Sequence, residues 1–185
     1  MIYGDRIRFR AVEHDDLPTF QKYVNDPEVT AGLGIYLPLS ILDEEDWFAG
    51  VRKHPPDERN LVIEIRHPNP ETGEDTWKMI GGTGFFNLDK RVRCAEFGIM
   101  IGDKTCWDQG YGAEAVRLLC RHGFSTLNLN RIYLRVLETN PRAIRAYEKA
   151  GFTHEGRQRQ AWYKDGRYYD FLVMSILKEE YIDSR

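Results

Sequence analysis

EFGIMIGDKTCWDQGYGAEA, residues 96–115, runs from an apolar strand through a polar loop into the start of a helix. A helix N-terminus carries unpaired N–H groups and a partial positive charge, and glycines let a phosphate approach the backbone closely. The stretch therefore predicts a pyrophosphate cradle, with a glycine-rich turn that merely opens a helix as the alternative. The residues that supply the N–H groups of this cradle are Gln109, Gly110, Tyr111, Gly112 and Ala113.

A second nucleotide motif fits the same glycines. Gly110-x-Gly112-x-x-Ala115 matches the dinucleotide fingerprint, and Glu138 follows at a plausible distance for a ribose-binding acid. In that fold the first glycine follows the strand directly, whereas DKTCWDQ intervenes here, and too little chain follows to complete the sheet. A Rossmann-type nucleotide oxidoreductase is therefore the less favoured alternative.

Outward from this stretch, apolar periodicity and turn residues divide the chain into strands and helices. Ser40 and Asp43 have the spacing of a capping box, and Gly151 is placed to end a helix. Residues 164–166 are placed to form the turn of a hairpin. The expected strands are Arg6–Arg10, Leu61–Arg66, Trp77–Leu88, Ala95–Ile101, Arg131–Val136, Thr153–Ala161 and Tyr168–Leu177. The expected helices are Glu13–Asn25, Ser40–Val51, the segment from the glycine loop to Leu127, and Pro141–Ala150, with loops at Gly32–Pro38 and at HPNPETGED, 67–75. This order predicts one α+β (mixed αβ) domain over residues 1–185.

Composition excludes several classes of partner. The net charge of −3 and the pI near 6.0 give no basic footprint, so no nucleic-acid partner is expected. No apolar run is long enough to span a membrane, and MIYGDRIRFR is not a signal peptide, so no membrane partner is expected. Cys94, Cys106 and Cys120 form no C-x-x-C pair, and the five histidines show no ligand spacing. These features predict free thiols, a cytoplasmic location and no metal.

Two segments taken together resemble one family. WDQGYGAEA, 107–115, is followed by LNLNRIYLRVLETNPRAIRAYEKAGF, 127–152. The pair is similar to N-acetyltransferases of the GNAT superfamily, and most of all to the RimJ/RimL type, which includes ribosomal-protein and spermidine acetyltransferases. The resemblance covers Ile7 to Leu177 and implies a central, mostly antiparallel sheet, splayed at the cofactor site and flanked by helices. It also implies an acetyl-CoA-dependent N-acetyltransferase, in which a primary amine attacks the thioester directly.

The resemblance implies how the cofactor is held. The loop from Gln109 to Ala113 would bind the CoA pyrophosphate, and Asn140 would contact the pantetheine arm. Asn140 stands before Pro141, however, and is also a good helix N-cap, so it can serve either or both roles. Trp107 and Asp108 depart from the pattern, because the superfamily often has Arg or Gln at the first position and this branch usually has Gly at the second. The strand residues that would pair with the arm are Ile99, Met100 and Ile101.

The resemblance also implies two catalytic residues. Tyr147 would be the general acid that protonates the departing thiolate, although its spacing from Ile144 also fits a core position. Glu96 stands fourteen residues before Gly110, the spacing of the catalytic glutamate in the histone-acetyltransferase branch. Because Glu96 shares a strand face with Gly98, we expect its side chain to point into a cleft or into water. Either Glu96 or a water chain would accept the proton of the amine.

The acceptor amine is the least determined partner. An N–H near Met100 would stabilise the oxyanion. The loop Gly32–Pro38, the second helix and the turn Tyr163–Tyr168 would select a protein N-terminal α-amine, a polyamine or another small amine. The acidic run Asp43–Asp46 could attract a polyamine, but acidic residues in a first helical turn usually complement the helix dipole. A non-catalytic acyl-CoA-binding module is a further alternative, and homodimerisation is left open.

Overall fold

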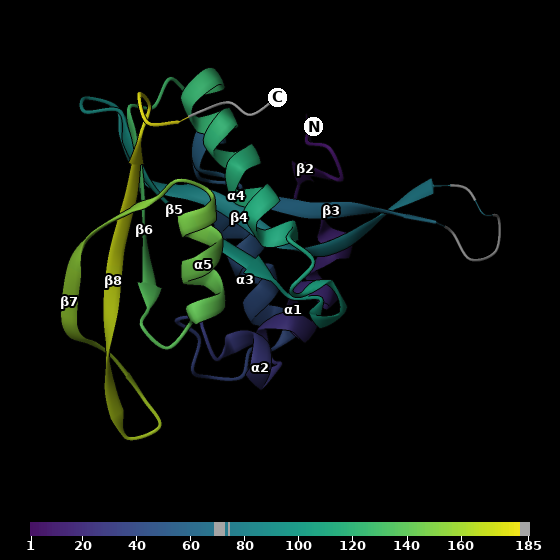
Figure 1. Cartoon of the computed structure of the whole chain (residues 1–185). Coiled ribbons are helices and arrows are strands. Elements are labelled where there is room, and N and C mark those ends of the chain that lie inside the picture. Colours follow the sequence, from purple (N-terminus) through teal and green to yellow (C-terminus); the bar gives the residue numbers. More distant parts are fainter. Residues whose placement is uncertain (69–72, 74, 182–185) are drawn as a thin grey trace.

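The computed structural model describes residues 1–68, 73 and 75–181, and within them the strands form one eight-stranded sheet (Figure 1). In spatial order the strands are β1, β2, β3, β4, β5, β6, β8 and β7. Every neighbouring pair of described strands is antiparallel except β5–β6, so the predicted mixed αβ fold with a mostly antiparallel sheet is confirmed. The strands are β1 Ile2–Tyr3, β2 Ile7–Ala11, β3 Leu61–Pro68, β4 Asp75–Asp89, β5 Cys94–Ile101, β6 Arg131–Leu137, β7 Thr153–Lys164 and β8 Arg167–Leu177.

Helices cover both faces of the sheet. In Figure 1, α4 and α5 lie side by side in front of it, while α1 and α3 lie behind it. The helix α4 continues into a π-helical turn at residues 122–126. The α-helices are α1 Leu17–Val24, α2 Pro27–Thr30, α3 Ile41–Val51, α4 Tyr111–Arg121 and α5 Pro141–Lys149.

Alternation along β3 shows why two apolar layers form. Ile63 is fully buried in the larger core, together with Leu119 of α4. Its neighbour Val62 is equally buried, but it belongs to a second cluster with Phe20 of α1, against which Trp47 of α3 packs. Successive residues of a strand point to opposite faces, so the sheet separates these two clusters.

The central strands β5 and β6 diverge. They pair only from Cys94–Glu96 to Arg131–Tyr133, three positions in register. Beyond them β5 stays paired with β4 as far as Ile101, and β6 stays paired with β8 as far as Leu137. Beyond these three positions, the edges of β5 and β6 that face each other form no hydrogen bonds between the strands. The predicted splay is therefore confirmed.

Most helix and turn signals lie where the sequence predicts them. Ser40 Oγ accepts from Asp43 N–H (3.3 Å) and Asp43 accepts from Ser40 N–H (2.7 Å), so the capping box is confirmed. Gly151 ends α5 with a φ of 93°, and residues 165 and 166 turn the β7–β8 hairpin, both with positive φ. The short elements β1 and α2 are not predicted, because two and four residues show no periodicity. Part of the predicted HPNPETGED loop lies outside the described residues.

Candidate active site

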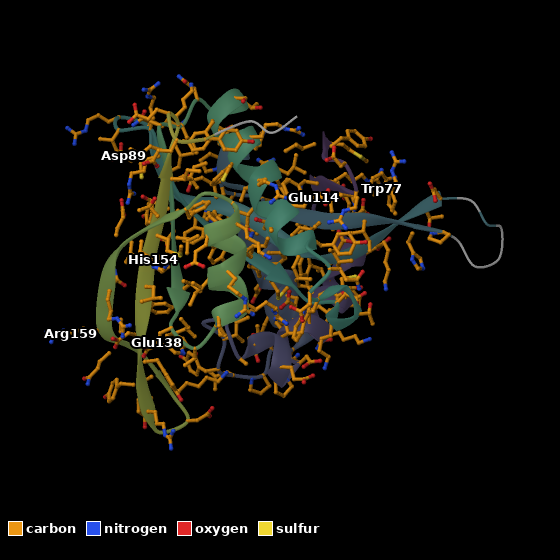
Figure 2. The ribbon with its side chains drawn as sticks, in the orientation of Figure 1. Trp77, Asp89, Glu114, Glu138, His154 and Arg159 are labelled. Atoms are coloured by element: carbon orange, nitrogen blue, oxygen red, sulfur yellow. The ribbon has the colours of Figure 1, made fainter. Side chains whose placement is uncertain are left out.

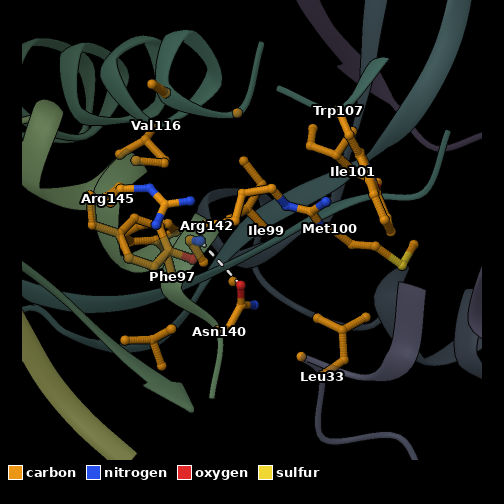
Figure 3. Close-up of a pocket in the computed structure, with 18 of the residues that line it drawn as sticks. Leu33, Phe97, Ile99, Met100, Ile101, Trp107, Val116, Asn140, Arg142 and Arg145 are labelled. Carbon is orange, nitrogen blue, oxygen red and sulfur yellow. Dashed lines mark hydrogen bonds between the residues drawn. The ribbon is translucent and has the colours of Figure 1, made fainter. Parts of the chain in front are cut away.

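A cavity of about 370 Å³, hereafter the central cavity, opens where β5 and β6 diverge (Figure 3). Residues 97–101 of β5 line one side, and Val136 at the end of β6 lines the other together with α5. The first turn of α4 and the loop Gly32–Gly34 also contribute to its walls. The cavity therefore lies between two strand edges that do not hydrogen-bond to each other.

The N-terminus of α4 faces the central cavity with unused N–H groups. Its first backbone bond runs from Glu114 N–H to Gly110 O (3.0 Å), and no side chain of the described residues caps it. Gly110, Gly112 and Ala113 line the cavity. A Cβ at Gly112 would meet only Ile101 Cγ1, at 3.9 Å, so open space lies in front of the backbone there. N–H dipoles directed at open space are what an anion site needs.

Gln109 and Tyr111 belong to the same turn but their side chains do not line the cavity. The Gln109 side-chain amide donates to Thr105 O. The Arg6 guanidinium lies 4.5 Å from the Tyr111 ring centroid, and it also pairs with Glu114 (2.7 Å), which Figure 2 labels on α4. These two residues can therefore contribute backbone N–H groups to an anion site, but not side chains.

Cationic side chains gather in the central cavity. Arg142, Arg145 and Lys149 lie at i, i+3 and i+7 of α5, and all three line it. In the described part of the chain none of them has an ion pair with a carboxylate. Figure 3 shows Arg142 and Arg145 extending from α5 into the cavity. None of the three is among the cofactor residues predicted from the sequence, although their spacing after Asn140 is a signal for them.

Trp107 and Asp108, the two departures from the family pattern, have distinct structural roles. The Trp107 indole N–H donates to Ile101 O (2.8 Å), which fastens the loop to the end of β5. The Arg142 guanidinium lies over the same ring, 3.6 Å from its centroid. Asp108 lines the cavity with a φ of 59°, a left-handed conformation that glycine adopts more easily than aspartate.

The backbone of β5 presents alternate residues to the gap. Gly102 N–H donates to Ile80 O of β4 (2.8 Å), and backbone groups alternate sides along a strand. The N–H of Met100 therefore points to β4, whereas those of Ile99 and Ile101 point to the gap. The expected oxyanion donor near Met100 is accordingly the N–H of Ile99 or of Ile101. The carbonyl of Ile101 also points to the gap, where it accepts from the Trp107 indole N–H.

Tyr147 is both a core residue and a wall of the central cavity. Its ring packs edge-on against Phe97, with centroids 5.8 Å apart, and against Phe152. The side chain is 8% exposed and belongs to the larger core, yet it lines the cavity. Its hydroxyl has no hydrogen-bond partner among the described residues, and burial raises its pKa. The phenol therefore stays protonated at physiological pH and is free to donate.

Glu96 is buried rather than directed into a cleft or into water, so that expectation is wrong. One carboxylate oxygen accepts from Arg135 Nε (2.7 Å) and the other from Asn87 Nδ2 (3.1 Å). Burial and then the Glu96 carboxylate raise the pKa of the nearby Tyr133. Glu96 pairs in register with Tyr133 at the last shared position of β5 and β6, so its ion pair spans the point where the strands diverge. Glu96 does not line the central cavity, but Arg135 does.

Asn140 caps α5 from the edge of the cavity. Its side-chain oxygen accepts from Ala143 N–H (3.1 Å), so the predicted N-cap is confirmed. A Cβ at Gly32 would lie 2.2 Å from Asn140 Nδ2, so any larger residue there would displace the Asn140 side chain. The cap therefore lies directly against the Gly32–Gly34 loop.

Comparison with known proteins identifies the family. The sequence model of the acetyltransferase (GNAT) domain matches residues 6–153. The chain belongs to this family. It is 30% identical over 181 residues to the uncharacterized N-acetyltransferase p20 of Bacillus licheniformis, covering 97% of both chains. It is 28% identical over 180 residues to the spermidine N(1)-acetyltransferase of Vibrio cholerae, covering 97% of this chain and 98% of that one.

A solved structure extends the likeness to the fold. The crystal structure of the Vibrio cholerae spermidine N-acetyltransferase in complex with CoA and spermine superposes with a TM-score of 0.82 and 27% identity, over 96% of this chain and 99% of that one. The protein is thus an N-acetyltransferase that uses acetyl-CoA. The Rossmann-type alternative is wrong, because β5–β6 is the one parallel pair among the described strands.

The central cavity of this acetyltransferase fits the cofactor. The open N-terminus of α4 suits the pyrophosphate, and the α5 cations Arg142, Arg145 and Lys149 complement its negative charge. The unpaired edge of β5 at Ile99 suits the amides of the pantetheine arm. Within the described residues no group of three or more His, Cys, Asp or Glu side chains could hold a metal ion. None of the described helices is both long and apolar enough to cross a membrane.

Proposed function

We propose that this acetyltransferase moves an acetyl group from acetyl-CoA to a primary amine by direct attack, as a member of the RimJ/RimL type. One observation carries the proposal: a single cavity holds the uncapped N-terminus of α4, the unpaired edge of β5 and the Tyr147 side chain. These three features suit a pyrophosphate, an extended amide-bearing arm and a departing thiolate. The relatives named spermidine N-acetyltransferases support an amine acceptor.

In the proposed reaction, a backbone N–H stabilises the oxyanion and a side chain protonates the leaving group. The N–H of Ile99 or Ile101 donates to the carbonyl oxygen on which negative charge develops. Tyr147 then donates its proton to the sulfur as the C–S bond breaks. Help of this kind is typically worth about 10²–10⁴-fold in rate. The acyl chemistry itself comes from the thioester of acetyl-CoA.

The proton of the acceptor amine has two routes, the Glu96 carboxylate and water in the central cavity. Both oxygens of Glu96 already accept hydrogen bonds, from Arg135 and Asn87, and the residue does not line the central cavity where the amine would react. Water is therefore the better supported route, with Glu96 positioning Arg135. The need for a base also depends on the acceptor, because an α-amine has a reference pKa of about 7.7–8.0 and a lysine-like amine about 10.4.

The test is a release assay for the CoA thiol with a panel of amines: peptides with free N-termini, polyamines and simple alkylamines. We expect at least one amine to release thiol above the rate of thioester hydrolysis, and mass spectrometry to find that amine acetylated. A melting temperature raised by acetyl-CoA, with no turnover of any amine, would instead identify a silent acyl-CoA-binding module. Limited proteolysis tests the proposed single domain over residues 1–185. Localisation in cells tests the proposed cytoplasmic location, and sedimentation tests for a homodimer.

A further inference from the structure

A second cavity, of about 480 Å³, lies between the segment before α3 and the β7–β8 hairpin, and we name it the hairpin cavity. Ten of the fifteen described residues that line it are aromatic or aliphatic, with Tyr36, Trp162 and Tyr169 as the aromatic members. Tyr36 meets Trp162 edge-on, with centroids 6.0 Å apart. Among the fifteen described residues that line it, Lys164 and Asp165 are the charged ones.

The hairpin cavity shares a wall with the central cavity. Gly32–Gly34 lines the central cavity, and the next residues, 35–38, line the hairpin cavity. Trp162 of the hairpin cavity contacts Phe171 of the central cavity, with ring centroids 6.2 Å apart. The outer edge of its indole ring also lies 3.5 Å from the Cβ position of Gly34. A molecule in the hairpin cavity is thus one side chain away from the acetyl-transfer site.

The polar groups around the hairpin cavity do not favour a polycation. The Lys164 ammonium lines it and donates to Thr30 O (3.2 Å). Nearby Asp26, at the start of α2, is paired with Lys104 (2.8 Å). The Trp162 indole N–H is buried with no acceptor among the described residues, and a donor of this kind attracts an oxygen, not an ammonium group. The lining thus offers Asp165 alone as a carboxylate, balanced by Lys164.

We propose that the hairpin cavity binds the acceptor, and that this acceptor is an amine carried on an apolar or aromatic group with no second positive charge. The inference rests on the proposed function and names its substrate class. The apolar lining residues stabilise a hydrocarbon group, whereas a second ammonium would find Asp165 as the one carboxylate of the described lining, offset by the Lys164 ammonium. The acceptor class therefore differs from the polyamine named for the relatives.

The first test compares octylamine with 1,8-diaminooctane, which share a carbon chain and differ in one ammonium group. With acetyl-CoA saturating, kcat/KM should be at least about tenfold higher for octylamine, because the described lining offers the second ammonium of the diamine no carboxylate except Asp165, which Lys164 offsets. Spermidine should have a kcat/KM as low as that of the diamine. Equal or better use of the diamine and spermidine would overturn the proposal.

The second test changes the charge of the cavity wall. Tyr36 is 69% exposed, so Tyr36→Glu and its uncharged control Tyr36→Gln should both fold. Tyr36→Glu should raise kcat/KM for the diamine about threefold to tenfold and lower it for octylamine, while Tyr36→Gln should not reverse the preference. Tyr168→Glu places the same charge on the same hairpin outside the cavity, and should leave the preference unchanged. A similar shift in Tyr168→Glu would refute a local effect.

Calorimetric binding of the two amines to the CoA complex separates this inference from the proposed function. Tighter binding of octylamine without any acetylation would support the hairpin cavity and reject acetyl transfer to these amines. Acetylation of both amines, bound with equal affinities that Tyr36→Glu does not change, would support acetyl transfer and reject the hairpin cavity as the acceptor site. Each outcome thus decides one of the two proposals.

Discussion

At the scale of single residues, the Tyr147 ring packs against Phe97 and Phe152 while the side chain also lines the central cavity. The ring has a packing role that phenylalanine can fill, and the hydroxyl is free of hydrogen bonds within the described structure. Replacing this tyrosine with phenylalanine therefore removes the chemical role and keeps the packing role, because the two side chains differ by one oxygen atom.

Tyr147→Phe should lower kcat by about 10²-fold or more, with little change in acetyl-CoA affinity, because it removes the proton donor and keeps the shape. Thiol-release kinetics measure kcat, and calorimetry measures affinity. Urea unfolding at neutral pH serves as the control and should match wild type. Wild-type turnover would mean that water or another group protonates the thiolate.

Asp108 gives a second prediction, since it brings a carboxylate and a φ of 59° to the cavity that we propose holds the CoA pyrophosphate. Asp108→Asn removes the charge and should tighten acetyl-CoA binding about threefold, as for a partly screened charge pair. Asp108→Gly should tighten binding similarly and also raise the unfolding free energy by about 1 kcal/mol, because glycine tolerates this backbone conformation. Weaker binding of both variants would show that the carboxylate supports the site.

At the scale of elements, the proposed cofactor role of the start of α4 depends on its backbone N–H groups. Gly112→Val fills the open space before the N–H groups and should abolish the rise in melting temperature on adding acetyl-CoA, while far-UV circular dichroism stays native. Gly50→Val in α3 is the matched control, since a Cβ there meets nothing within 4 Å and lies outside the central cavity. A normal shift in Gly112→Val would remove this turn from the cofactor site.

The divergence of strands β5 and β6 is the second feature to which we assign a role, and the Glu96–Arg135 ion pair spans the point where it begins. Glu96→Gln should lower the unfolding free energy by about 1–2 kcal/mol, a value reduced because Arg135 is half-exposed. If Glu96 positions Arg135, the variant should raise KM and keep the pH profile of kcat. A loss of kcat at low pH that recovers at high pH would instead assign the base to Glu96.

At the scale of the whole molecule, buried phenols couple stability to alkaline pH. Burial raises the pKa of Tyr147, and burial with a smaller effect of Asp103 and Cys106 raises that of Tyr23 to about 12. The folded state therefore holds these protons more tightly than the unfolded chain, whose tyrosines titrate near 10. Their contribution is complete below pH 10 and is lost as pH rises from about 10 through 12.

Urea unfolding between pH 8 and pH 11 should show a falling free energy of unfolding above about pH 10. Tyr23→Phe and Tyr147→Phe should each make this fall less steep, because the group that titrates is gone. Tyr163→Phe, which changes an exposed ring, should leave the slope unchanged. Identical slopes in all three variants would assign the alkaline loss to other groups.

The sequence by itself determined what depends on neighbours a few residues apart. The capping box at Ser40, the cap at Asn140 and the glycine at the start of α4 follow from backbone hydrogen bonds within one helical turn. The order of strands and helices followed from apolar periodicity, and with it the mixed sheet. The caps and the helix starts are local, so spacing alone predicts them.

Tertiary structure alone decided which groups meet across the cavity. Glu96 lies buried because Arg135, thirty-nine residues later, supplies its counter-charge. The direction of the Met100 N–H depends on the register of β4 against β5, since a one-residue slip exchanges the two sides. The charge of the hairpin cavity likewise depends on which side chains two distant loops bring together. Burial and pairing are properties of three-dimensional neighbours, and spacing along the chain does not encode them.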